Sequence, residues 1–287
     1  MVGQVPGWVL EMPELAFLSF AGNPGVVSEE EVERTAVLDR IPWSELEVQY
    51  LLGEGASGVI SRGVWKSGTE KEQAVAVKVF KVAITSDGSP VDEMAATLTA
   101  GSHANLITPL GKIHSHPDAK KGLVLQLIPP HYTNLGLPPS LESCTRDNFP
   151  AGTTLGLAHV KSILLGIASA ASHLHDRGIL HGDLYAHNIL TDPSGHALLG
   201  DFGAATVYGA NHEMKEKLER LDVLGFAHLV EDLLGLVVRD LGVGKEIMDE
   251  KEGALIEELN RLHWRCSDPV VARRPGFGEV REVLEGL

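Results

Sequence analysis

The sequence has few cysteines, few basic residues and no long apolar run, and each shortage excludes a class of protein. Two cysteines among 287 residues are too few for a disulfide framework, which favours a reducing compartment such as the cytosol. The 24 lysines and arginines are outnumbered by 39 aspartates and glutamates, and the formal net charge of -15 argues against a nucleic-acid partner, which would need a basic face. The most apolar stretches, such as 160–171, are interrupted by polar residues and fall short of the ~20 residues that cross a bilayer. We therefore expect a cytoplasmic chain with neither nucleic acid nor a membrane as partner.

The first 40 residues differ from the remainder and are predicted to form an N-terminal extension. Residues 15–23 fit the pattern L-x-x-L-x-L-x-x-N and resemble one leucine-rich repeat, which could contact a partner protein. A single repeat cannot bury its own apolar face, and no second copy is visible, so this would be a terminal repeat. An ordinary apolar strand that packs on the domain is the alternative. Residues 28–40 are typical of an N-capped helix or an acidic linker.

Residues 41–287 are predicted to form the main folded part, because a chain that is 44% hydrophobic can bury a substantial core. Short runs rich in β-branched residues predict an antiparallel sheet with strands at 46–52, 59–64, 74–79 and 122–128. Helix formers occupy 91–100, and apolar residues at three- and four-residue spacing predict a strong helix over 159–178. Proline-rich residues 129–150 are predicted to be a connecting loop. The second half is therefore mainly helical.

A glycine-rich turn between two predicted strands is the first chemical signal. Gly53, Gly55 and Gly58 would let backbone N–H groups approach phosphate oxygens without obstruction by a Cβ atom. Neither a dinucleotide-binding fingerprint nor a Walker loop fits the surrounding sequence, because the first needs a following helix and the second needs Gly-Lys-Ser/Thr. Glycine-rich turns between strands are common, so this signal is weak by itself.

A lysine in an apolar strand is the second signal. Lys78 follows the run Ala-Val-Ala-Val and is expected to be buried, which is costly unless a carboxylate or a phosphate meets it. Glu93 in the predicted helix is the natural partner, with Asp92 as the adjacent alternative. A lysine on an edge strand, exposed to solvent, is the other interpretation.

Two further segments carry a family resemblance. The sequence ILHGDLYAHNIL covers residues 179–190 and is followed by LLGDFGAAT at 198–206. Together with the glycines and Lys78, these segments resemble the protein kinase family. The resemblance covers about residues 45–287 and is closest to the tyrosine-kinase-like group. The repeat-like N-terminus suggests the leucine-rich-repeat protein kinases of bacterial type.

The resemblance implies a catalytic role for particular residues. Asp183 would orient the attacking hydroxyl, Lys78 paired with Glu93 would hold the α- and β-phosphates of ATP, and Asn188 and Asp201 would bind Mg²⁺. Asp222 would bond the backbone of the loop at 181–188, which we call the 181–188 loop. Protein substrates, most simply through Ser or Thr hydroxyls, would be the acceptors.

The implied fold is α+β with two lobes and ATP in the cleft between them. The N-lobe would cover 41–128, with an antiparallel sheet and one helix, and the helical C-lobe 129–287. Adenine would contact the backbone of two residues after the last N-lobe strand and would lie between three apolar side chains. The backbone contacts would come from Gln126 and Ile128, and the apolar side chains would be those of Ile60, Ala76 and Leu190.

The sequence departs from the family pattern in several places. Gly182 stands where an arginine usually precedes the catalytic aspartate, so control by phosphorylation of the following segment is in doubt. That segment, 201–222, is short and lacks Ala-Pro-Glu, which leaves Arg274 without its usual carboxylate; Glu213, Glu216 or Glu219 could replace it. Tyr185 and His187 stand where a lysine or arginine usually meets the γ-phosphate.

Two other functions stay open at this stage. Small-molecule kinases of the aminoglycoside and choline type share the motif His-Gly-Asp-Leu. The Val-Ala-Val-Lys strand and the C-terminal segment argue against assigning the chain to that class. A catalytically silent scaffold would be expected to have lost Lys78, Asp183, Asn188 or Asp201, yet all four are present.

Overall fold

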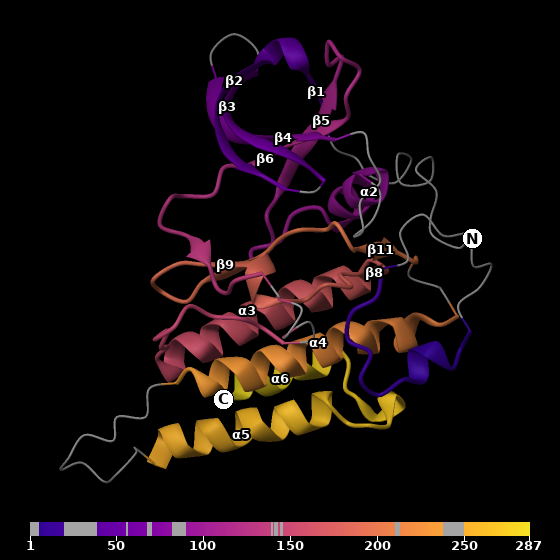
Figure 1. Ribbon diagram of the computed structural model, residues 1–287, viewed down its shortest axis with the longest axis vertical. Helices are drawn as coiled ribbons and strands as arrows, with labels where there is room; N and C mark the ends of the chain where they lie inside the picture. Colours follow the sequence, from indigo (N-terminus) through magenta and orange to yellow (C-terminus); the bar gives the residue numbers. More distant parts are fainter. Residues whose placement is uncertain are drawn as a thin grey trace, which may run out of the picture.

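The computed structural model describes residues 6–19, 39–55, 57–67, 71–81, 90–138, 140, 143, 146–209, 213–237 and 250–287. Figure 1 shows a lobe of strands with one helix above a larger, mainly helical lobe. This is the two-lobed α+β fold that the resemblance implied. The helix or linker expected over 28–40 lies outside the described residues except for its last two positions.

The upper lobe is built on a six-stranded sheet with the order β1-β5-β6-β4-β3-β2. Its strands are β1 (Asp39–Pro42), β2 (Leu46–Glu54), β3 (Gly58–Ser67), β4 (Lys71–Phe80), β5 (Pro109–His114) and β6 (Gly122–Gln126). Neighbours are antiparallel except β1 and β5, which are parallel. No local pattern predicts this parallel pair, because β1 is only four residues long and its partner lies far along the chain.

Successive side chains of β4 point to opposite faces of the sheet. Val75 and Val77 pack in an apolar cluster on one face. Phe80 packs in a second cluster, against α2 (Pro90–Ala100). Lys78 is two residues from Phe80 and therefore points to the face that α2 covers.

The described residues of the lower lobe form four α-helices, with short strands at the upper side of the lobe (Figure 1). The helices are α3 (Leu157–Asp176), α4 (Lys215–Gly235), α5 (Glu250–Cys266) and α6 (Phe277–Gly286). Their apolar faces meet in one large core cluster. The short strands are β7 (Thr133–Asn134), β8 (Ile179–Leu180), β9 (Ile189–Thr191), β10 (Ala197–Leu199) and β11 (Thr206–Val207). The 3-10 turns of this lobe are η1 (Val9–Glu11), η3 (Ala186–Asn188) and η4 (Val271–Arg273), whereas η2 (Trp43–Glu45) lies between β1 and β2 in the upper lobe.

Helix α3 is the central element of this core. Its fully buried side chains recur at three- and four-residue spacing, as the sequence predicts. Gly178, with φ +68°, reverses the chain just after the helix ends. By length and composition α3 could cross a membrane, but 61% of its most apolar window is buried inside the protein, as in a core helix.

Two short antiparallel pairs position the 181–188 loop. β8 pairs with β11, and β9 pairs with both β10 and β7. The loop leaves β8 and enters β9, while residues 200–205 connect β10 to β11. These pairings therefore place the two connections side by side.

The described N-terminal residues, 6–19, which we call the strap, pack on the lower lobe (Figure 1). Leu10 is fully buried, and Ala16 belongs to the main core cluster. Leu15 and Leu18, two positions of the repeat-like pattern, pack beside Leu10. Residues 20–23 of that pattern lie outside the described residues, so the leucine-rich repeat stays a prediction.

Candidate active site

A buried ion pair connects the sheet of the upper lobe to its helix. Lys78 of β4 forms its ion pair with Glu93 of α2, and the two residues are only 8% and 3% exposed. A charge buried to this depth is tolerated because the opposite charge and the hydrogen bond replace water. The other carboxylate oxygen of Glu93, Oε2, is buried and accepts no hydrogen bond within the described residues.

The glycines at the turn from β2 to β3 have two different structural roles. A Cβ atom on Gly53 or Gly55 would meet no atom within 4 Å, so open space lies beside both. A Cβ atom on Gly58 would lie 2.8 Å from the carbonyl oxygen of Val79, so this glycine is required by the close approach of β4. The turn is held by a hydrogen bond from the Gly55 N–H to the Gly58 carbonyl, 3.0 Å long.

Asp222 of α4 holds the beginning of the 181–188 loop from inside the lobe, as the resemblance implied. Its carboxylate accepts hydrogen bonds from the N–H groups of His181 and Gly182, both 2.9 Å long. The Nε2 atom of His175 lies 2.9 Å from the same carboxylate. Burial by itself would raise the pKa of Asp222, but these hydrogen bonds and the nearby imidazoles lower it overall.

Asp183 and Asn188, at the two ends of the loop, are joined directly. The Asn188 side-chain amide donates to both the backbone carbonyl and the Oδ2 atom of Asp183, each at 2.8 Å. Burial raises the pKa of Asp183, and His181 and Asn188 oppose only part of that rise. The loop thus presents one carboxylate whose orientation is set by a neighbouring amide.

Asp201 lies beside this pair. The Gly200 N–H donates to the Asn188 carbonyl at 2.9 Å, which joins the two connections immediately before Asp201. Asp201 is exposed, has φ +51°, and accepts a 3.1 Å hydrogen bond from the Gly203 N–H. Its negative charge contributes to the raised pKa of Asp183. The structure therefore brings Asp183, Asn188 and Asp201 together.

The two lobes meet close to these residues. Helix α2, which carries Glu93, contacts both β8 and β11, the strands that flank the 181–188 loop and the 200–205 connection. The residues expected around adenine come from β3, β4, β6, β9 and the chain after β6; these are Ile60, Ala76, Gln126, Leu190 and Ile128. The Gln126 N–H already donates to the Thr108 carbonyl at 2.9 Å, so Gln126 would have to contact adenine through its own carbonyl.

Asp147 is a second carboxylate at the loop, and no sequence motif marks it. Its Oδ1 atom accepts a 2.6 Å hydrogen bond from the Ala186 N–H. Burial is the main cause that raises the pKa of Asp147 to about 7, and the charges of Asp232 and Asp183 add to the rise. Asp147 comes from the predicted connecting loop 129–150, and only folding brings it to Ala186.

Arg274 is buried, and among the described residues its guanidinium donates to carbonyl oxygens. The acceptors belong to Asp268, Arg220 and Pro13, with the last contributed by the strap. Glu219, one of the three glutamates considered as partners, instead accepts a 2.8 Å hydrogen bond from the Tyr208 hydroxyl. The missing carboxylate is thus replaced by main-chain oxygens.

The donor set fits a magnesium nucleotide. Mg²⁺ prefers oxygen ligands and usually takes one or two from the protein, with phosphate oxygens completing its shell. Asp201 and Asn188 provide a carboxylate and an amide oxygen at one place, and the open space beside Gly53 and Gly55 leaves room for phosphates. Within the described residues no group of three or more His, Cys, Asp or Glu side chains forms a metal cluster.

A family model described as protein tyrosine and serine/threonine kinase matches residues 46–224. The chain belongs to the protein kinase family. The match covers both lobes as far as α4 and includes each residue to which the resemblance assigned a catalytic or metal-binding function.

Named relatives agree with this assignment. The chain is 28% identical over 284 residues to a probable serine/threonine-protein kinase, gdt4, of Dictyostelium discoideum, covering 88% of this chain and 16% of the relative. It is 34% identical over 160 residues to the L-type lectin-domain containing receptor kinase VIII.1 of Arabidopsis thaliana, covering 54% and 20%. It is 29% identical over 189 residues to the serine/threonine-protein kinase PITSLRE of Drosophila melanogaster, covering 65% and 17%. The chain therefore spans less than a third of the length of each of these relatives.

Proposed function

We propose that this chain is an ATP- and Mg²⁺-dependent protein kinase that transfers the γ-phosphoryl group of ATP to a serine or threonine hydroxyl of a protein. The observation that carries the proposal is the complete set of functional side chains in one arrangement. The buried Lys78–Glu93 pair lies in the upper lobe, and Asp183, Asn188 and Asp201 gather in the lower lobe.

Each of these side chains has a defined task in phosphoryl transfer. Lys78, oriented by Glu93, would bind phosphate oxygens of ATP. Asp183 would accept a hydrogen bond from the acceptor hydroxyl and orient that oxygen for attack, and Asn188 holds its carboxylate in place. When held by Asn188 and Asp201, Mg²⁺ would supply charge neutralisation at the phosphate oxygens.

Serine or threonine is proposed as the acceptor because several of the similar proteins are named serine/threonine-protein kinases. The scarcity of cysteine supports the cytoplasm as the proposed location. A contact between the repeat-like N-terminus and a partner protein stays a prediction.

Transfer from γ-labelled ATP with Mg²⁺ tests the proposal. The purified chain is assayed alone, with generic protein substrates and with a panel of aminoglycosides and choline. Asp183→Asn and Lys78→Met are expected to abolish transfer while leaving the chain folded. Lys78→Met should lower the thermal unfolding midpoint, because it leaves the buried Glu93 carboxylate without its cation. Asp176→Asn, at an exposed aspartate near the end of α3, is the matched control and should retain activity.

The acceptors decide between the alternatives. Label on protein serine or threonine that disappears in both variants supports the proposal. Label on a small molecule alone would assign the chain to another class of kinase, and ATP binding without transfer to any acceptor would make it a scaffold.

A further inference from the structure

The strap reaches the 181–188 loop at the residue just before Asp183. The Leu18 N–H donates a 3.3 Å hydrogen bond to the Gly182 carbonyl. A Cβ atom on Gly182 would lie 2.9 Å from the carbonyl oxygen of Leu18 and 3.0 Å from that of Ala204. The strap backbone therefore occupies the space into which any side chain at position 182 would point.

An aromatic contact extends this attachment past Asp183. The rings of Phe17 and Tyr185 are stacked, with centroids 3.8 Å apart and planes at 12°. Tyr185 is 4% exposed, and its N–H donates a 3.0 Å hydrogen bond to the Asp183 carbonyl. Phe17 also lies against α4, because a Cβ atom on Gly225 would be 3.6 Å from its ring.

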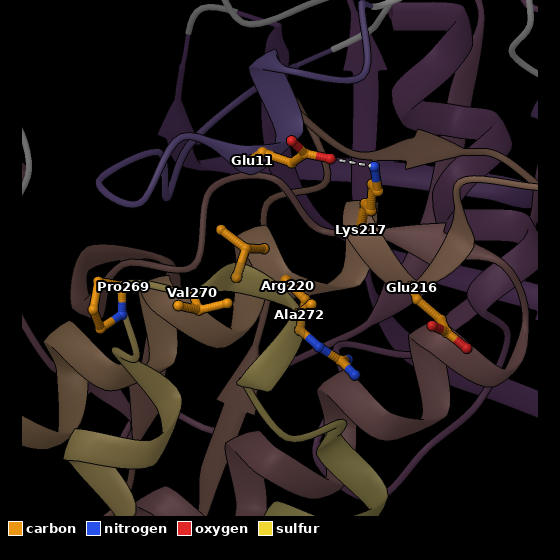
Figure 2. Close-up of a pocket in the computed structure, with 8 residues that line it drawn as sticks. Glu11, Glu216, Lys217, Arg220, Pro269, Val270 and Ala272 are labelled. Atoms are coloured by element: carbon orange, nitrogen blue, oxygen red, sulfur yellow. Dashed lines mark hydrogen bonds and ion pairs between the residues drawn. The ribbon is translucent and has the colours of Figure 1, made fainter.

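The strap is itself firmly anchored at its other end. Leu10 is fully buried among Leu180, Leu218 and other apolar residues. Glu11 forms a 2.6 Å ion pair with Lys217 of α4, and Figure 2 shows this pair at a surface pocket between the strap, α4 and η4. The buried guanidinium of Arg274 donates to the Pro13 carbonyl. The strap thus connects the rigid helical part of the lobe to the loop.

Gly182 is consequently held from two sides. Asp222 of α4 accepts its N–H, and Leu18 of the strap donates to its carbonyl. Each attachment restrains the same short turn that sets the direction of Asp183. The loop therefore has a structural restraint that does not depend on a phosphate group in residues 201–222.

We propose that the strap is a positioning element of the active site, in which Leu18 and Phe17 hold Gly182 and Tyr185 so that Asp183 is oriented for transfer. This inference rests on the proposed kinase function. Phe17 acts through Tyr185 and does not touch the reacting atoms. A displacement of Asp183 by about 1 Å is enough to slow transfer, because the step depends on the alignment of donor and acceptor.

Substitution of Phe17 separates positioning from simple packing. Phe17→Ala removes the ring, Phe17→Leu keeps apolar volume without the ring, and Phe17→Tyr keeps the stacking. Trp8→Ala is the matched control, because Trp8 is an aromatic residue of the same strap but is 66% exposed. For each variant we measure kcat, the KM for ATP, the unfolding midpoint and hydrogen exchange of the Gly182 and Tyr185 amides.

Phe17→Ala is expected to lower kcat by between about 10-fold and 100-fold, with the KM for ATP little changed. Phe17→Tyr and Trp8→Ala should each keep kcat close to the wild-type value. If Phe17→Ala does not fold, Phe17→Leu provides the same comparison. An unchanged kcat in an otherwise active enzyme would overturn the inference, and an increased kcat would show that the strap inhibits.

Hydrogen exchange tests the inference independently of activity. Exchange at Gly182 and Tyr185 should accelerate in Phe17→Ala and not in Trp8→Ala. Unchanged protection would refute the positioning role, even if the wild-type chain transferred no phosphate. Absence of transfer by the wild-type chain would instead count against the proposed function.

Discussion

Two carboxylates that accept hydrogen bonds from the 181–188 loop have pKa values that move in opposite directions. Asp222 accepts two loop N–H groups and lies against His175, and these donors lower its pKa despite burial. Asp147 accepts only one loop N–H, from Ala186. Burial, together with nearby negative charges, raises its pKa to about 7. Hydrogen-bond donors and imidazoles around Asp222 outweigh the effect of burial on its pKa, whereas the surroundings of Asp147 do not.

Asp147→Asn is expected to change how stability depends on pH. The pKa of Asp147 is about 7 in the folded chain against an ordinary value of 3.8, so only the unfolded chain releases this proton as the pH rises from about 4. Below about pH 4 the protonated carboxyl makes its full contribution to the stability of the folded chain. This contribution is lost as the pH rises to about 7. A pKa that is higher by one in the folded chain than in the unfolded chain corresponds to roughly 1.4 kcal/mol of unfolding free energy.

The measurement is the denaturant midpoint of both chains between pH 4 and pH 8. Asp147→Asn should lack the part of the decline caused by this proton, because an amide does not titrate and can still accept the Ala186 N–H. Asp118→Asn, at an exposed aspartate, is the control. Parallel curves for wild type and Asp147→Asn would contradict the assignment.

At the scale of elements, the 181–188 loop is shaped by a left-handed turn. Gly182 has φ +75°, a conformation that costs residues with a Cβ atom about 1 kcal/mol or more. The neighbouring backbones of the strap and of Ala204 leave no room for that atom. The glycine that departs from the family pattern is therefore required by this packing.

Gly182→Ala is expected to destabilise the chain by about 2 kcal/mol or more, because strain and close contacts add. Gly278→Ala is the matched control. Gly278 lies in α6, where an added Cβ atom would meet nothing within 4 Å. The unfolding free energy of Gly278→Ala should therefore stay within about 0.5 kcal/mol of the wild-type value or exceed it. Thermal or denaturant unfolding compares the two, and equal effects would show that the strap does not restrict position 182.

At the scale of the whole molecule, the candidate active site is divided between the lobes. Lys78 and Glu93 belong to the upper lobe, whereas Asp183, Asn188 and Asp201 belong to the lower one. A nucleotide that contacts both groups should stabilise the folded chain by an amount that grows with its concentration relative to its Kd.

Asp201→Asn is expected to remove the magnesium dependence of this stabilisation. In the wild-type chain, ATP with Mg²⁺ should raise the unfolding midpoint more than ATP with EDTA does, because Asp201 and Asn188 would hold the ion beside the phosphates. In Asp201→Asn the two conditions should give similar midpoints, while Asp118→Asn should resemble wild type. A full magnesium effect in Asp201→Asn would exclude Asp201 as a ligand.

Local patterns in the sequence determined the main elements and most of the candidate site. Strands β2, β3 and β4 and helices α2 and α3 follow from short-range alternation, helix-forming composition and helical periodicity. The Asp183–Asn188 and Lys78–Glu93 contacts join residues only 5 and 15 positions apart, within motifs that can be recognised directly.

The tertiary structure alone decided the contacts between residues that no motif connects. Asp147 meets Ala186 across 39 positions, and Arg274 meets Pro13 across 261. The strap belongs to the predicted N-terminal extension and contacts the 181–188 loop through backbone groups and one aromatic pair. Such contacts depend on where whole elements pack and not on the residue types next to them, so they leave no periodic signal in the sequence.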